Sequence, residues 1–431
     1  MKVLIITYYW PPAGGPGVQR WLKFVKYLRD YDIEPVVYTV ANPQYPIVDH
    51  TLEKDLPNNL EVLRFPIWEP NNLFAFFKKP RANQSAGFLN PNPGFFGKIA
   101  QYIRANFFIP DARKYWIQPS VRFLKTHLKE DQIDLIISTG PPHSVHLIGL
   151  ALKRDLQLPW IADFRDPWTG IDYFDQLPLT ASSLAKHHML EKEVLDEADA
   201  VLVVGNTMKE NFEALSKNVH VLSNGYDTEA IDANTSPAHL DTTFSITHVG
   251  AMNSDRNPNI LWQVLADLCL ENSDFEKDFE LKLIGHIAPQ VQESISKSGL
   301  QNVRYLGYLN HQDIHRYQET SQVLLLSVNQ VSSAKGIVTG KVFEYLKARR
   351  PILAIGPVDG DLAAILKETK AGEIVDFTDA KKLKEILLNL YRNFKEGKVS
   401  LESTHIEQYH RKHLTEELSK IIKKTIDTYH S

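Results

Sequence analysis

The sequence predicts an α/β protein made of two doubly wound domains, each built on a parallel sheet. Short apolar runs alternate with segments of helical periodicity along the chain. The runs are uninterrupted, as expected of strands buried on both faces of a parallel sheet. The alternation breaks once, in the polar stretch 226–245, and then resumes. A chain of 431 residues therefore divides into two domains of about 200 residues each.

The first half contains six predicted strands, at residues 3–7, 35–40, 135–138, 160–163, 201–204 and 219–222. Apolar residues at helical spacing follow the first strand, from Trp21 to Leu28, and recur over 145–152 and 184–198. Strand, helix and strand repeated in this way indicate right-handed crossovers between parallel strands.

The second half repeats the pattern, with predicted strands at 246–249, 281–284, 303–306, 323–327, 352–355 and 373–375. Apolar residues spaced for one helix face run through 405–431 and predict a C-terminal amphipathic helix. That helix must pack on the first domain or on a partner. The expected organisation is a first domain at 1–226, a second at 227–408 and the terminal helix at 409–431.

Segment 68–118 does not follow the alternation. It is rich in aromatic residues and carries seven basic residues against two acidic ones. One interpretation is an inserted helical subdomain with an aromatic core. The other is a basic, apolar surface that rests on anionic lipid or holds a lipid-linked substrate, since interfacial segments combine cationic and aromatic side chains. Its aromatic residues include Phe74, Phe76, Phe77, Phe88, Phe95, Phe96, Phe107, Tyr115 and Trp116.

Composition excludes several classes of protein. With 48 basic and 52 acidic residues the formal net charge is −4, which argues against a protein whose main partner is nucleic acid. The single cysteine, Cys269, excludes an intramolecular disulfide and a multi-cysteine metal site. The chain has no apolar stretch of about 18 residues, and its first apolar run is too short for a signal peptide. We therefore expect a cytoplasmic protein.

Gly14 and Gly15 follow the first strand and precede a helix. Glycines there let backbone N–H groups approach an anion, and the helix N-terminus adds a favourable dipole. The spacing matches neither the dinucleotide fingerprint nor the P-loop. A plain tight turn is the alternative interpretation.

The stretch Thr339–Ala348 carries the most specific chemistry. Gly340 and Lys341 stand at a predicted helix start, where unpaired N–H groups and a positive charge favour phosphate. Glu344 lies about one turn further on the same face, where it can accept hydrogen bonds from a sugar diol. The alternative is an exposed Lys–Glu pair, but the apolar residues between them indicate a helix that is mostly buried.

The order of these motifs resembles that of the retaining, nucleotide-sugar-dependent glycosyltransferases of family 4, over nearly the whole chain. The motifs are Gly14-Gly15, Ala198–Val201, Ser223–Asp227, His248-Val249-Gly250, Leu283–His286, Val303–Tyr308 and Thr339–Ala348. The resemblance implies a GT-B fold, in which two Rossmann-like domains face each other across a cleft. The first domain would be on the acceptor side, and the second would bind the nucleotide sugar.

The resemblance also implies a donor site. Glu344 would bind the ribose hydroxyls, and Thr339, Gly340 and Lys341 would receive phosphate. Arg256 would contact the diphosphate, and the Gly14-Gly15 turn would close over the donor. The sequence departs from the family at Gly336, where the first glutamate of the E-x7-E pattern is expected, and at Ala251, where arginine is usual. The implied donor-binding residues are Gly14, Gly15, Gly250, Arg256, His286, Thr339, Gly340, Lys341 and Glu344.

Two further loops follow strands of the first domain. Ligands bind beyond the carboxyl ends of strands in open α/β sheets, which makes His143, Asp163, Arg165 and Asp166 candidates for acceptor contact or proton handling. Of these, His143, Arg165 and Asp166 are the predicted catalytic residues. Asp359-Gly360-Asp361 is interpreted as a loop with an aspartate helix cap, and no histidine spacing predicts a metal site.

These observations predict a glycosyltransferase that moves a sugar from a nucleotide-sugar donor to a glycan or lipid-linked acceptor with retention. We expect assembly of a polysaccharide or a cell-envelope glycan as its role, no metal or other cofactor, and no nucleic-acid partner. Peripheral contact with an anionic membrane would follow from the second interpretation of segment 68–118. The alternatives are a nucleotide-sugar 2-epimerase of the same architecture and a non-catalytic protein that binds a sugar nucleotide.

Overall fold

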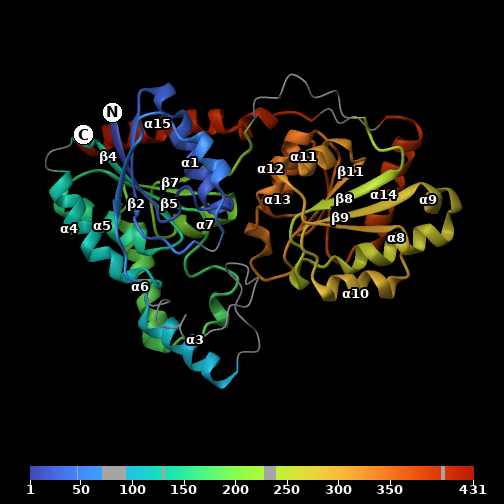
Figure 1. The fold of residues 1–431 in the computed structure, drawn as a ribbon, viewed down its shortest axis with the longest axis horizontal. Helices are drawn as coiled ribbons and strands as arrows, with labels where there is room; N and C mark the ends of the chain where they lie inside the picture. The colour runs from blue at the N-terminus through green and yellow to red at the C-terminus, as the bar shows by residue number, and fades with distance from the viewer. Residues whose placement is uncertain (46, 70–93, 129–131, 228–238, 399–402) are drawn as a thin grey trace. The chain divides into compact units, whose positions relative to one another are not determined.

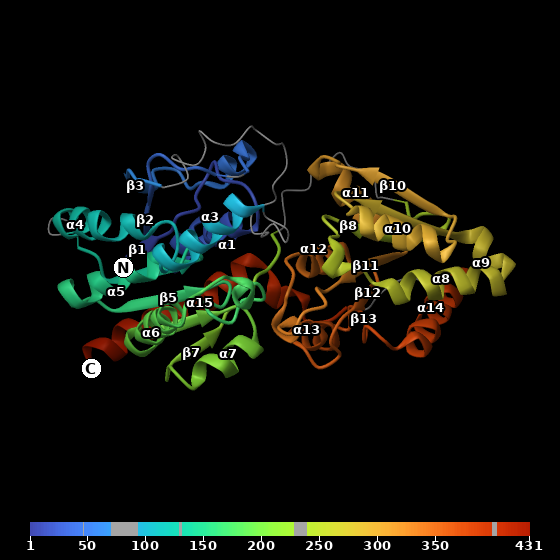
Figure 2. The same cartoon turned by 90° about the horizontal axis from the view of Figure 1, so that it is seen from below.

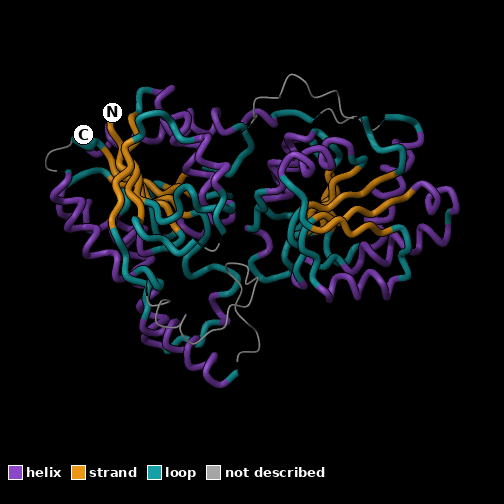
Figure 3. Tube along the Cα trace, viewed as in Figure 1, coloured by secondary structure: helices purple, strands orange, loops and turns teal. Residues whose placement is uncertain are grey.

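The computed structural model describes residues 1–431 apart from 46, 70–93, 129–131, 228–238 and 399–402. It confirms the α/β class, with one parallel sheet in each of two compact units. The first unit comprises Met1–Asn224 and Arg411–Ser431, and the second comprises Gly225–His410. Figures 1 and 3 show each sheet with its helices around it. Among the described helices, none is long and apolar enough to cross a membrane.

The first sheet has seven parallel strands in the order β3-β2-β1-β4-β5-β6-β7. The chain runs outward from β1 in one direction and then outward from β4 in the other, so the strand order reverses between these two neighbours. The strands are β1 (Lys2–Ile6), β2 (Glu34–Val40), β3 (Glu61–Phe65), β4 (Leu135–Gly140), β5 (Trp160–Phe164), β6 (Ala200–Val203) and β7 (Val219–Val221).

Sequence analysis missed β3, an edge strand. Its sequence, Glu-Val-Leu-Arg-Phe, lacks the uninterrupted apolar run of the inner strands, and all five residues are partly or fully exposed. A strand with one paired edge needs less apolar surface than one buried on both faces.

Helices cover both faces of this sheet (Figures 1 and 2). The helices of this unit are α1 (Pro16–Leu28), α3 (Phe95–Phe107), α4 (Ile117–His127), α5 (Ser144–Leu156), α6 (Ala181–Glu197), α7 (Asn206–Glu213) and α15 (Arg411–His430). Alternate residues of β1 pack on opposite sides: Val3 and Ile5 pack with α1 and α15, whereas Leu4 and Ile6 pack with α4–α7.

The C-terminal helix α15 belongs to the first unit. Leu414, Leu418 and Ile422 are buried in the same apolar cluster as the side chains of α1. At its start, Lys412 pairs with Asp30 at 3.0 Å. The chain therefore returns to its first unit after completing the second.

Segment 68–118 contributes both core and surface. Trp116 is fully buried and stacks on Tyr38 with ring centroids 5.2 Å apart. In contrast, α3 exposes Phe107, Tyr102 and Ile99 by 61%, 45% and 42%. Phe74, Phe76, Phe77 and Phe88, which the sequence placed in this segment, lie outside the described residues.

The second sheet has six parallel strands in the order β10-β9-β8-β11-β12-β13, and its order reverses between β8 and β11. Its strands are β8 (Phe244–Val249), β9 (Phe279–Ile284), β10 (Val303–Gly307), β11 (Val323–Ser327), β12 (Ile352–Ile355) and β13 (Gly372–Val375). Its helices are α8 (Asn259–Glu271), α9 (Ser273–Asp278), α10 (Pro289–Ser298), α11 (His311–Thr320), α12 (Lys341–Ala348), α13 (Asp361–Thr369) and α14 (Ala380–Lys395).

A buried ion pair organises the carboxyl end of the first sheet. Asp163, on β5, is 0% exposed and pairs with Arg20 of α1, with Nη2 to Oδ1 at 2.9 Å. Its Oδ2 accepts hydrogen bonds from Trp21 Nε1 at 2.6 Å and Thr139 Oγ1 at 2.8 Å. Arg20 Nη1 also donates to the Ser223 carbonyl oxygen at 2.9 Å. This carboxylate therefore joins α1, β4 and β5 and, through Arg20, the segment after β7.

Replacing Asp163 with Asn should lower the free energy of unfolding of the first unit by about 3–5 kcal/mol, because Arg20 would remain buried without its counter-charge. Urea unfolding followed by tryptophan fluorescence measures this, since six of the seven tryptophans lie in the first unit.

The control for that experiment is Asp155→Asn. Asp155 pairs with Lys125 at 2.9 Å on the surface, where its side chain is 42% exposed. Such a pair contributes roughly 0–1 kcal/mol. Equal effects of the two substitutions would contradict the role given to Asp163.

Candidate functional site

The predicted donor-binding residues of the second unit gather at the carboxyl end of its sheet. Gly250 follows β8, Gly285 and His286 follow β9, and Lys341 opens α12 after β11. Because β8 and β11 flank the point where the strand order reverses, these loops border the crevice where ligands bind in open α/β sheets.

Two glycines let these loops pack closely. Gly250 has φ +109°, and a Cβ there would lie 2.4 Å from Cε of Lys341. Gly285 also has φ +109°, and a Cβ there would lie 2.6 Å from the Gly250 carbonyl oxygen. A side chain at either position would be both strained and obstructed. The two turns therefore form a base on which the Lys341 side chain lies.

Two positive charges, those of Lys341 and Arg256, lie close to these turns. Burial and, to a smaller extent, the positive charge of Arg256 together lower the pKa of Lys341 to about 8, while the negative charge of Glu344 opposes both. Lys341 Nζ lies 3.4 Å from the Ala251 carbonyl oxygen, and Arg256 Nε donates to Asn329 Oδ1 at 2.5 Å. Two cations beside a helix N-terminus make a site that favours an anion.

Glu344 is partly buried, and its Oε2 accepts a hydrogen bond from Gln318 Nε2 at 3.2 Å. Thr339 Oγ1 accepts one from the Lys341 amide at 3.3 Å. Gly340 has an ordinary helical φ of −56°, so its backbone conformation does not require glycine. The space that a Cβ at Gly340 would enter is open. His286 is exposed at the end of β9.

The first unit brings its own candidates to the equivalent place, where β1 and β4 lie side by side. Gly15 has φ +91° at the start of α1. The Gly14 amide already donates to the Ile47 carbonyl oxygen at 2.9 Å, and a Cβ on Gly14 would lie 2.8 Å from the Ile47 side chain. Gly14 thus serves close packing of this turn, and its N–H is engaged within the protein.

His143 is buried at the start of α5, where its ring stacks on Trp168 with centroids 4.8 Å apart. Burial, with a smaller contribution from His146, holds its pKa well below the usual value, so the ring is neutral at physiological pH. Asp111, from segment 68–118, accepts hydrogen bonds from Ser144 N and Oγ at 2.8 Å. It thereby fixes the helix start that carries His143.

Arg165, another of the predicted catalytic residues, makes several hydrogen bonds within the first unit. Its buried guanidinium donates to the carbonyl oxygens of Gly17, Pro141 and, at 3.1 Å, Gly140. It therefore ties the first turn of α1 to the His143 loop after β4. Asp166, the third predicted catalytic residue, is exposed.

The expectation that Asp163 contacts an acceptor is wrong, because its carboxylate has no exposed surface and is bonded to three side chains. Sequence analysis also missed Arg20, Asp111 and Tyr345, which hold the two sites in place. Arg20 and Asp111 belong to no recognisable motif, and Tyr345 stands in the Thr339–Ala348 stretch as one of its apolar residues. Each acts through contacts with residues distant in sequence.

The described residues contain no group of three or more His, Cys, Asp or Glu side chains placed to hold a metal ion. In the predicted Asp359-Gly360-Asp361 loop, Asp359 pairs with Lys335 at 2.5 Å. Gly360 is the N-cap of α13 and Asp361 is its first residue, so the predicted aspartate cap is wrong.

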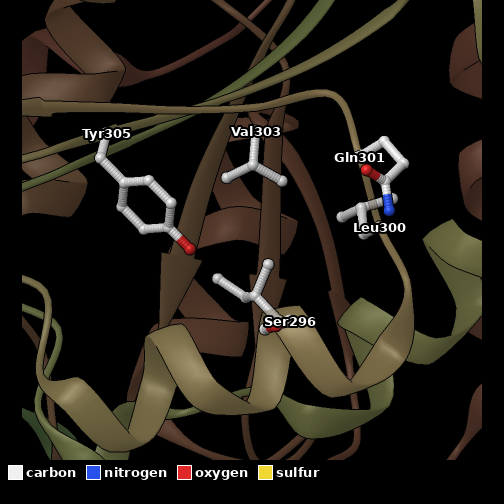
Figure 4. Close-up of a pocket in the computed structure, with 6 residues that line it drawn as sticks. Ser296, Leu300, Gln301, Val303 and Tyr305 are labelled. Atoms are coloured by element: carbon white, nitrogen blue, oxygen red, sulfur yellow. The ribbon is translucent and has the colours of Figure 1, made fainter.

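A surface pocket of the second unit lies between α10 and β10 (Figure 4). Ser296 and Leu300 come from the end of α10 and the turn after it, whereas Val303 and Tyr305 come from β10. The pocket contains none of the predicted site residues. It lies toward the start of β10, away from the loops that carry Gly285 and Lys341.

Comparisons with known proteins agree with this architecture. Residues 17–230 match the model for Glycosyltransferase Family 4, and residues 243–393 match that for Glycosyl transferases group 1. No curated protein sequence matches the chain.

Solved glycosyltransferase structures share the fold at low sequence identity. A mutant of S. aureus TarM in complex with Fondaparinux, alpha-GlcNAc-glycerol and UDP is 12% identical with a TM-score of 0.59, covering 100% of both chains. Sucrose-phosphate synthase from Thermosynechococcus elongatus is 14% identical with a TM-score of 0.59, covering 99% of both. WaaG, a glycosyltransferase involved in lipopolysaccharide biosynthesis, is 13% identical with a TM-score of 0.55, covering 97% of this chain and 99% of its own.

The family matches and the two parallel-sheet units together show that the chain belongs to the family 4-like, group 1 glycosyltransferases and is a glycosyltransferase enzyme with the GT-B fold.

Proposed function

We propose that this enzyme transfers a sugar, with retention, from a nucleotide-sugar donor to a glycan or lipid-linked acceptor. The observation that carries the proposal is Lys341, which lies on the Gly250 turn beside Arg256 at the N-terminus of α12. This arrangement suits the diphosphate of a nucleotide sugar. UDP in the related TarM complex supports the class of donor.

The chemistry requires stabilisation of the departing nucleoside diphosphate as the glycosidic bond breaks. Negative charge grows on the leaving phosphate oxygen, and groups already aimed at that point lower the barrier. Lys341, Arg256 and the first N–H groups of α12 would supply this stabilisation. Because the protein itself brings these cations to the site, we propose a reaction that needs no metal ion.

Glu344 would bind the ribose diol, with Gln318 fixing one of its carboxylate oxygens. In the first unit, Asp166 is exposed and His143 is neutral, so we propose these two residues for contact with the acceptor. Arg165 would act by holding the His143 loop against the first turn of α1.

Two alternatives make different products. A 2-epimerase would change the sugar of the donor without any acceptor, and a non-catalytic binder would leave the donor intact. Incubation with a panel of UDP-, GDP- and ADP-sugars, followed by mass spectrometry and NMR of the products, separates them. A glycosidic product with the anomeric configuration of the donor supports the proposal. Epimerised or unchanged donor, with acceptor present, would contradict it.

The α3 helix supports a lipid-linked acceptor and peripheral contact with an anionic membrane. Ile99 and Tyr102 lie on one exposed face, and Lys98 and Arg104 are also exposed. The WaaG likeness supports an acceptor of the envelope-lipid class. Asn106 fixes this helix to the loop before α6 through the Pro178 carbonyl oxygen and the Thr180 amide, at 2.8 and 2.7 Å. Such a face can enter the headgroup region while the basic residues contact anionic lipid.

Glu344→Gln should weaken binding of the donor nucleotide by about 1–3 kcal/mol, because a hydrogen bond to a charged acceptor would be lost. Calorimetric titration with UDP, or with whichever nucleoside diphosphate binds most tightly, measures this. Glu373→Gln, at an exposed position of β13, is the control and should leave affinity unchanged. If both variants bind like the original chain, Glu344 does not hold the ribose.

Binding of UDP should weaken as the pH rises above about 8. The ammonium of Lys341 titrates near that value in the empty site, and only its protonated form attracts the diphosphate. Lys341→Arg keeps its charge throughout and should show a flat profile between about pH 7 and about pH 9.5. Calorimetry across this range compares the two proteins, and parallel profiles would rule out Lys341 as the titrating contact.

Ile99→Glu combined with Tyr102→Glu should abolish binding to vesicles of phosphatidylglycerol and phosphatidylcholine, because two carboxylates would enter the interface. Co-sedimentation at low salt measures the bound fraction, which should also fall as salt screens the charges. The control is Leu270→Glu, at a position of α8 that is 87% exposed. Equal binding to neutral and anionic vesicles, or no binding by the original chain, would exclude the membrane contact.

A further inference from the structure

Tyr345 occupies the point where the second sheet reverses its strand order. It lies on α12, one turn after Lys341, and its side chain is fully buried. Its hydroxyl accepts a hydrogen bond from the Val249 amide of β8 at 3.0 Å. The same hydroxyl donates to the Leu325 carbonyl oxygen of β11 at 3.3 Å. A side chain from the helix therefore stands between two neighbouring strands.

The strand pairing explains why a side chain fits there. β8 and β11 pair at Ile246 with Val323 and at Thr247 with Leu324, and the pairing goes no further. Beyond it, the hydroxyl oxygen takes the place of a direct bond between the strands. Adjacent paired strands lie about 4.8 Å apart, and a hydroxyl oxygen bonded to both strands needs more room than a direct bond between them. Tyr345 thus acts as a spacer at the end of the ladder.

His248 completes the arrangement at the Leu325 carbonyl. Its Nδ1 lies 3.1 Å from that oxygen, and since the carbonyl only accepts, Nδ1 carries the proton. Burial, reinforced by the charge of Lys341, keeps the pKa of His248 well below its usual value. The neutral ring and the Tyr345 hydroxyl together use both lone pairs of the Leu325 oxygen.

Tyr345 connects the two parts of the proposed anion site, which are the Gly250 turn and the start of α12. Val249, which donates to the hydroxyl, immediately precedes the Gly250 turn beneath Lys341. Lys341 and Tyr345 are on the same short helix. A change in the spacing of β8 and β11 therefore moves the Gly250 turn relative to the cation above it.

We propose that Tyr345 is a positioning residue that sets the distance between the Gly250 turn and the start of α12, and so fits this site to the diphosphate of a nucleotide. The inference rests on the proposed function of the same site. A tyrosine that merely filled the core would contribute through its ring, and its hydroxyl would not affect which ligand binds.

Tyr345→Phe tests this by removing one oxygen and keeping the ring. Affinity for UDP should fall about tenfold, whereas affinity for uridine, which lacks the phosphates, should stay within about twofold. The matched control is Tyr391→Phe, which removes the hydroxyl that donates to Asp278 at 2.8 Å, elsewhere in the same unit. The control should change neither affinity. Calorimetry gives the UDP values, and ligand-observed NMR gives those for uridine.

Amide hydrogen exchange measures directly whether the hydrogen bond from the Val249 amide to the Tyr345 hydroxyl is present. In Tyr345→Phe the Val249 amide should lose protection, while the Gly250 amide, which donates to the Ile284 carbonyl oxygen at 2.7 Å, should keep it. This measurement needs no ligand. It therefore remains informative if the original chain binds neither UDP nor GDP nor ADP, an outcome that would overturn the proposed function instead.

Equal losses for UDP and uridine, unchanged UDP affinity, or a protected Val249 amide in Tyr345→Phe would each overturn the positioning role. If that variant does not fold, His248→Leu removes the second donor to Leu325 and should weaken UDP binding selectively. His248→Asn, whose side-chain amide can replace Nδ1, should restore it. Identical UDP affinities of the original chain and the two His248 variants would also overturn the proposal.

Discussion

The buried carboxylate of Asp163 is the contact on which the carboxyl end of the first sheet depends. It holds Arg20 and Trp21 of α1 and Thr139 of β4 against the end of β5. Burying such a pair costs desolvation energy, so it is a poor source of stability compared with apolar packing. Its hydrogen bonds are directional, however, and they fix the positions of α1, β4 and β5 relative to one another. A binding site at the end of a sheet depends on such fixed positions.

Different contacts fix the elements at the carboxyl end of the second sheet. Here a tyrosine hydroxyl bridges β8 and β11, and two glycines with positive φ allow the turns to touch. In both sheets the ordered polar contacts join elements that lie on either side of the point where the strand order reverses: α1, which follows β1, with β4 in the first sheet, and β8 with β11 in the second. That point is where neighbouring loops diverge and leave room for a ligand. Side-chain hydrogen bonds are therefore most needed where the backbone pairing between strands ends, because they hold the loops in place there.

Most of the fold was predictable from the sequence, because strands buried on both faces must be apolar throughout. The exception, β3, is an edge strand that begins with Glu61 and whose apolar residues are interrupted by Arg64. The position of α15 could not be predicted, since its apolar face would fit several surfaces. Its packing on α1 depends on the folded first unit.

The candidate site was predictable in part. Lys341 and Gly250 were found from a local motif and a turn, and the structure brings them into contact. The same reasoning assigned Asp163 to an acceptor, because position at a strand end does not reveal whether a carboxylate is exposed. Tyr345 was missed for a related reason: its partners, Val249 and Leu325, belong to strands far away in sequence. Contacts of this kind follow from tertiary structure alone.

The account rests on the claim that the start of α12 and the Gly250 turn together receive the diphosphate of the donor. A crystal structure of the complete chain with a bound nucleoside diphosphate tests this claim most directly. The account predicts phosphate oxygens within hydrogen-bond distance, about 2.7–3.2 Å, of Lys341 Nζ and of the first amides of α12. A diphosphate bound elsewhere, with Lys341 still resting against the Ala251 carbonyl oxygen, would contradict it.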